Sequence, residues 1–217
     1  MLDLSIDLII LFVAVPMGLL TIKKTDPLYL KLLPFFLLLT LSVELVAQQF
    51  MENGQNNLWI YNFYSIIEFV FYTYFFRMVI PDKKIKKALG YVLYLLPVIL
   101  LGNIFFIQGV MAFHTYTYAL ASLTMIALGI IYFFKVFNDT KEPSLLRDPS
   151  FWMGIAIVFF FISSISVLGV LNYVSTLPRN ARNLLQNIFL WVNAFYYLLF
   201  IIAFLCKTNI LKSSPSS

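Results

Sequence analysis

Histidine and cysteine, which supply many metal ligands and catalytic groups, are almost missing from this sequence. The only histidine is His114 and the only cysteine is Cys206. One histidine cannot build a three-histidine zinc site or an HExxH motif, and one cysteine cannot close an intrachain disulfide. No glycine-rich phosphate loop occurs among the eight glycines. The sequence therefore predicts no metal site and no bound cofactor, and it disfavours most enzymatic functions.

Charged residues are scarce as well. They make up 12% of the 217 residues, whereas hydrophobic residues make up 61% and include 23 Phe and 13 Tyr. A soluble domain usually has about 25% charged residues. This composition predicts an integral membrane protein, with the lipid bilayer as its first partner. The net charge of +5 is explained by lysines in the connections between helices, so we expect no nucleic-acid partner.

Seven apolar stretches are each long enough to cross a bilayer as a helix, which takes about 20 residues. They cover approximately residues 4–22, 29–49, 58–80, 88–108, 113–137, 151–173 and 184–206. We therefore expect an all-α polytopic membrane protein. Residues 1–206 would form one seven-helix transmembrane domain, and residues 207–217 a short cytoplasmic tail.

The basic residues predict how this domain is oriented. Of the 15 lysines and arginines, 13 fall on one side of the predicted membrane, and only Arg179 and Arg182 fall on the other. Because short cytoplasmic loops retain basic residues, the N-terminus is expected outside and the C-terminus in the cytoplasm. The lysine run 83–87 could also bind anionic lipid head groups, although retention of the loop in the cytoplasm explains it sufficiently.

The third stretch, LWIYNFYSIIEFVFYTYFFR over residues 58–77, carries an acid near its middle. At 100° per residue Tyr61, Ser65, Glu68 and Tyr72 fall in one narrow stripe, so this helix should have a polar face turned toward other helices. An acid at the centre of a membrane helix costs about 2.5 to 3.5 kcal/mol on insertion scales. Glu68 therefore indicates a functional site.

Polar residues on other predicted helices fall in the same outer half of the membrane. If these stripes converge, they line a polar pocket that is open to the exterior. The candidate ligand-binding residues are Glu44, Gln48, Tyr61, Asn62, Ser65, Glu68, Tyr72, Asn103, His114, Asn193 and Tyr197. A plainer interpretation is that the amide and hydroxyl groups only form hydrogen bonds between helices, each of which stabilises the bundle by about 0.6 kcal/mol. His114 could likewise be an interfacial histidine that meets water.

The two glutamates are less easily explained as structural groups. No lysine or arginine lies at the expected depth of Glu44 or Glu68. Each acid should then be neutral and hydrogen-bonded to Tyr, Asn or Gln, unless a cation or an amine ligand supplies the missing charge.

The segment NLWIYNFYSIIEF, from Asn57 to Phe69, resembles a family of small seven-helix inner-membrane proteins of bacteria. The resemblance rests on an aromatic-rich pattern around Asn62 and Glu68 and covers mainly the second and third helices. It implies a location in the bacterial inner membrane and supplies no activity.

Together these features predict a receptor-like or sensory membrane protein that binds a small molecule. With only a short tail, it should signal through a separate cytoplasmic or membrane partner. A small-solute or proton-coupled transporter using Glu44 and Glu68 is the main alternative. A lipid-modifying enzyme acting through Glu68 and a structural subunit of a membrane complex also stay open.

Overall fold

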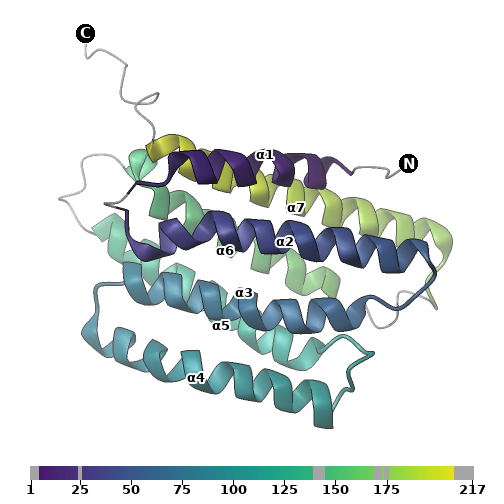
Figure 1. The fold of residues 1–217 in the computed structure, drawn as a ribbon. Coiled ribbons are helices and arrows are strands. Elements are labelled where there is room, and N and C mark those ends of the chain that lie inside the picture. The colour runs from purple at the N-terminus through teal and green to yellow at the C-terminus, as the bar shows by residue number, and fades with distance from the viewer. Residues whose placement is uncertain (1–4, 24–25, 139–144, 169–172, 174–175, 208–217) are drawn as a thin grey trace.

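Seven α-helices make up most of the computed structural model, which describes residues 5–23, 26–138, 145–168, 173 and 176–207 (Figure 1). The fold class is therefore confirmed as all-helical. The elements are α1 (Ile6–Thr21), α2 (Leu28–Glu52), α3 (Leu58–Val79), α4 (Lys83–Phe106), α5 (Thr115–Asn138), the short 3-10 helix η1 (Leu145–Arg147), α6 (Pro149–Leu168) and α7 (Arg179–Lys207). Residues 169–172 of the predicted sixth span, and 208–217 of the predicted tail, lie outside the described residues.

Four of these helices are long and apolar enough to cross a membrane, namely α2, α4, α5 and the part of α7 from Arg179 to Cys206. Their length and composition indicate an integral membrane protein. The apolar helices α1 and α6 are shorter, with 16 and 20 residues. In α3, which has 22 residues, five tyrosine and asparagine side chains and one glutamate lower the hydropathy.

Six of the helices form a closed ring. α1 packs against α2 and α7, α7 against α6, α6 against α5, and α3 closes the ring by packing against both α5 and α2. α4 lies outside this ring, at the edge of the molecule, where it packs on α3 and α5 (Figure 1). Its outer face is apolar, and Tyr94 and Phe106 are 80% and 88% exposed. Such a face suits contact with lipid.

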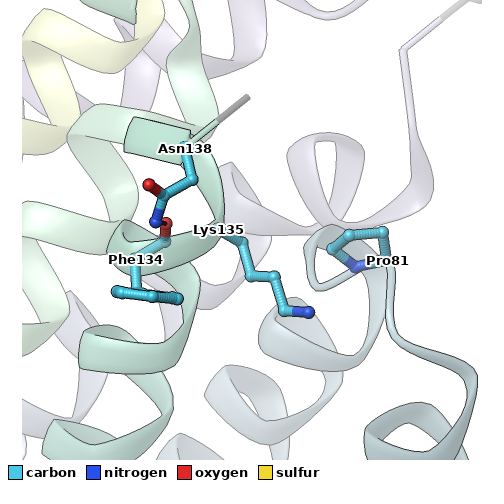
Figure 2. Close-up of a pocket in the computed structure, with 4 residues that line it drawn as sticks. All are labelled: Pro81, Phe134, Lys135 and Asn138. Carbon is cyan, nitrogen blue, oxygen red and sulfur yellow. Dashed lines mark hydrogen bonds between the residues drawn. The ribbon is translucent and has the colours of Figure 1, made fainter. Parts of the chain in front are cut away.

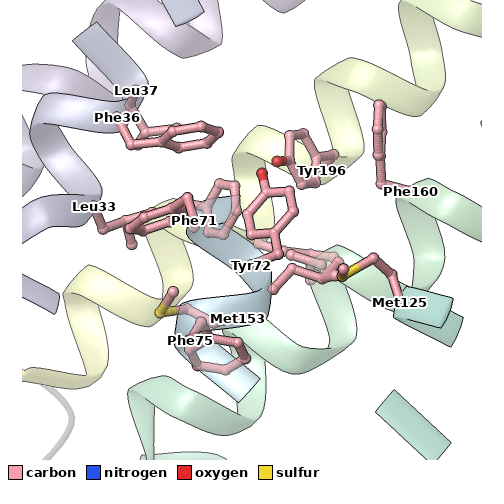
Figure 3. Packing of buried hydrophobic residues seen from close by; sticks show 14 of the residues in the cluster. Leu33, Phe36, Leu37, Phe71, Tyr72, Phe75, Met125, Met153, Phe160 and Tyr196 are labelled. Atoms are coloured by element: carbon pink, nitrogen blue, oxygen red, sulfur yellow. The ribbon is translucent and has the colours of Figure 1, made fainter. Parts of the chain in front are cut away.

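The interior of the ring is filled largely by aromatic side chains from several helices (Figure 3). Phe36 of α2 stacks on Phe71 with ring centroids 4.5 Å apart, and Tyr72 meets Phe161 of α6 edge-on at 5.9 Å. Phe160 stacks on Tyr196 of α7 at 4.7 Å. Aromatic pairs in these offset and edge-to-face arrangements stabilise the packing beyond their buried area. The polar groups of the interior are thus surrounded by packed aromatic side chains.

α4 begins five residues before the span predicted at 88–108, because Asp82 caps the helix. The Asp82 carboxylate accepts hydrogen bonds from the backbone N–H groups of Lys84 and Ile85, at 2.8 and 3.1 Å. These bonds hold the pKa of Asp82 below its usual range. The cap is therefore fully present at neutral pH and weakens as the pH falls through that lowered pKa. The lysine run 83–87 consequently forms the first turn of a helix and does not lie in a loop.

Candidate functional site

The helix α3 carries most of the candidate site residues, and it lies in the ring between α2 and α5. Asn62, Ser65, Glu68 and Tyr72 follow one another at intervals of three or four residues, so they share one face of the helix. All four side chains are buried, with exposed fractions of 3% or less. The polar face of α3 is therefore turned toward the other helices.

Glu68 lies in the middle of α3, and its carboxyl group is buried without a described partner that would offset the loss of hydration. Among the residues that the structure describes, no lysine or arginine lies within salt-bridge distance of its carboxyl group, and none donates a hydrogen bond to it. The hydroxyls within electrostatic range belong to Tyr64 of α3, Tyr118 of α5, and Tyr196 and Tyr197 of α7. A buried carboxyl without a cation or a donor is unfavourable unless it takes up a proton or a cationic ligand.

Glu44 of α2 is the second acid of this group and is only half-buried. The hydroxyl of Tyr61 donates a hydrogen bond to the Glu44 carboxylate at 2.9 Å. One turn further along, the hydroxyls of Thr40 and Tyr64 are 2.8 Å apart, so two polar pairs join α2 to α3. Glu44 and Glu68 lie within electrostatic range of each other. We call the two glutamates with Tyr61, Tyr64, Tyr118, Tyr196 and Tyr197 the acid group.

α7 contributes to this group, whereas Gln48 does not. Tyr197 is 3% exposed and lies within electrostatic range of both acids. Asn193 is buried one turn earlier on the same helix, with 8% of its surface exposed. Gln48 instead donates a hydrogen bond along its own helix to Glu52, at 2.8 Å and in an exposed position.

A separate network of hydrogen bonds engages the other candidates, beginning at Asn62. The Asn62 side-chain amide donates to the carbonyls of Val110 and Ala112, at 2.9 and 2.8 Å, and its oxygen accepts from the backbone N–H of His114. The Ser65 hydroxyl lies 2.6 Å from Nε2 of His114. These bonds fasten the connection between α4 and α5 onto α3.

The same network continues to α4. Nδ1 of His114 lies 2.9 Å from the hydroxyl of Thr117, which also accepts a hydrogen bond from Asn103. Asn103 donates to Gln108 as well, and Gln108 donates to Thr115. Both ring nitrogens of His114 are thus engaged, and the side chain is fully buried. In this arrangement Asn62, Ser65, Asn103 and His114 hold helices together and leave few free polar atoms for a ligand.

Four hydroxyl groups in the interior have no hydrogen-bond partner among the described residues, those of Tyr72, Thr73, Ser164 and Tyr196. The side chains of Tyr72 and Tyr196 point into the same central region of the ring (Figure 3). Sequence reasoning missed Tyr196, because it lies 100° away from the polar stripe that contains Tyr197. Two adjacent tyrosines in an otherwise apolar stretch of α7 were the available signal.

The network around Asn62 makes a testable prediction. Asn62→Ala should lower the free energy of unfolding by about 2 kcal/mol, because it leaves two carbonyls and one backbone N–H without partners. Unfolding of the detergent-solubilised protein measures this loss. Asn138→Ala is the matched control, because the Asn138 side chain donates a hydrogen bond in an exposed position, to the carbonyl of Phe134 in its own helix. Its effect should stay within about 0.5 kcal/mol, and equal losses would contradict the proposed role of Asn62.

No family model matches this chain, and neither a curated protein nor a solved structure is significantly similar to it. The chemistry of the acid group is therefore the evidence on function. Tyrosine hydroxyls can donate hydrogen bonds to a carboxylate, and tyrosine ring faces attract cations. An acid surrounded by such rings can hold a proton, or it can pair with the positive charge of a small ligand.

Proposed function

We propose that all seven helices cross the bacterial inner membrane, with the N-terminus outside and the C-terminus in the cytoplasm. The distribution of charge between the two ends of the helices supports this orientation. Lys23, Lys83 and Lys135 belong to one end, together with most other described basic residues, whereas Arg179 and Arg182 begin α7 at the other end. Short cytoplasmic connections retain lysine and arginine in this way.

Within this membrane domain we propose a receptor-like function, in which the acid group binds a small cationic molecule such as an organic amine. The observation that carries the proposal is the Glu68 carboxyl, which is buried among tyrosines with no described cation or hydrogen-bond donor. An amine would supply the missing charge, and the rings of Tyr118 and Tyr196 would add cation–π attraction. Signalling would then pass to a separate membrane or cytoplasmic protein.

The binding experiment uses the purified full chain and a panel of primary and quaternary amines. Native mass spectrometry detects a retained ligand, and the melting temperature reports stabilisation by each amine. Glu68→Gln keeps the shape of the side chain but removes its charge, so it should abolish the stabilisation. Glu52→Gln is the control, because Glu52 is an exposed acid at the end of α2. Stabilisation that survives in Glu68→Gln would exclude Glu68 as the binding residue.

A proton-coupled transporter is the second candidate, and the electrostatic interaction between Glu44 and Glu68 favours it. The two acids lie within electrostatic range of each other, and Glu44 is half-buried whereas Glu68 is fully buried. Two such groups could pass a proton inward in two steps. Proton-driven solute flux in proteoliposomes that is lost in both Glu44→Gln and Glu68→Gln would favour transport. Ligand stabilisation without flux would favour the receptor.

A further inference from the structure

A shallow cavity that is open at the surface lies at the lysine-rich end of the molecule, away from the acid group. Its volume is about 420 Å³, and it is lined by Pro81, Phe134, Lys135 and Asn138. Lys135 extends from the last turns of α5 toward Pro81 in the connection between α3 and α4 (Figure 2). The cavity is therefore formed by two segments that are more than 50 residues apart in the sequence.

Positive charge dominates the surroundings of this cavity. Lys135 is 41% exposed, and its ammonium lies 3.8 Å from the carboxylate of Asp82, which is too long for a strong ion pair. Asp82 is at the same time engaged in capping α4. Lys83 and Lys84 follow it directly and are exposed. The ammonium of Lys135 thus keeps hydrogen-bond donors for a second anion.

The α5 side of the cavity, which carries Lys135, also has an exposed apolar surface. Phe134 lines the cavity and is 68% exposed, and Phe137 on the same helix is 65% exposed. Asn138 adds a polar amide at the end of α5, where its nitrogen donates to the carbonyl of Phe134. The site therefore presents a cation and an amide next to an exposed aromatic surface, at the level where a helix leaves the bilayer.

We propose that this cavity binds the phosphate group of an anionic phospholipid, with Lys135 as its main contact and Phe134 beside the first part of an acyl chain. A soluble anion would not need the exposed phenylalanines, so the occupant to which we commit is a lipid. The proposal rests on the membrane insertion proposed above but is independent of the ligand of the acid group. The proposed phosphate site lies next to the lysine run 83–87 at the start of α4.

The test measures lipids retained by the full chain in native mass spectrometry, after reconstitution with equal amounts of phosphatidylglycerol and phosphatidylcholine. Preferential retention of phosphatidylglycerol is expected. Lys135→Gln should reduce this preference about five-fold, the loss expected for one lysine at an anionic surface. Lys135→Arg should retain it. Arg182→Gln, which removes one charge at the opposite end of the molecule, is the matched control and should leave the preference unchanged.

Asp82→Asn should change the retention of phosphatidylglycerol in the opposite direction to Lys135→Gln. Asparagine caps helices about as well as aspartate, so α4 should keep its start, whereas the loss of the negative charge frees Lys135. Retention of phosphatidylglycerol should therefore increase about two- to five-fold. Equal retention of both lipids, an unchanged preference in Lys135→Gln, or displacement of the lipid by inorganic phosphate would overturn the site. Retention of neither lipid would overturn membrane insertion as well.

Discussion

Glu68→Met is expected to stabilise the protein, by about 2 to 3 kcal/mol, while it abolishes the binding of amines. Methionine has a similar length and volume but carries no charge and needs no hydrogen-bond partner. Because no described residue compensates the Glu68 carboxyl, its removal takes away an energetic cost and breaks no hydrogen bond or ion pair with a described residue. A structural acid would behave in the opposite way, since its partners would be left unpaired.

Glu44→Met is the natural control for this experiment. Glu44 accepts a hydrogen bond from Tyr61, so its removal leaves the partly buried tyrosine hydroxyl unpaired and should lower stability by about 1 kcal/mol. Chemical unfolding in detergent measures both variants on one scale. Destabilisation by Glu68→Met would show that Glu68 has structural partners in the native membrane, and the proposed cation site would then be wrong.

Gly129→Val is expected to cause the largest loss of stability among the substitutions considered, about 3 kcal/mol or more. Gly129 of α5 faces α6 so closely that an added Cβ would clash with a methyl group of Val158. A valine side chain is branched at Cβ and has few alternative rotamers, so it cannot easily move aside. The two helices would have to separate, and the ring would open between α5 and α6.

Val158→Ala provides the test of this explanation. Removing the methyl groups that Gly129 approaches should restore part of the stability in the double variant, so that the two substitutions are not additive. Gly102→Val is the matched control, because an added Cβ at Gly102 meets nothing within 4 Å. Its cost should stay within about 1 kcal/mol. Strictly additive losses at Gly129 and Val158 would exclude a direct contact between them.

Helical periodicity is a local pattern, so it predicts which residues share a face of a helix but not which groups that face contacts. The spacing of Asn62, Ser65, Glu68 and Tyr72 identifies one face of α3 correctly, because helical periodicity depends only on positions along the chain. It could not identify which groups that face meets. Ser65 and Glu68 are one turn apart, yet Ser65 bonds to His114 whereas Glu68 makes no hydrogen bond with the described residues.

The sequence by itself determined the helical class, the apolar character of the chain and the presence of a buried acid on α3. Each of these follows from composition and from the 3.6-residue period of the helix. Only the tertiary structure decided that α4 lies outside a ring of six helices, and that Asn103 and His114 belong to a network apart from Glu68. The physical reason is that apolar helices of similar length can pack in many orders, and the contacts between specific side chains select one of them.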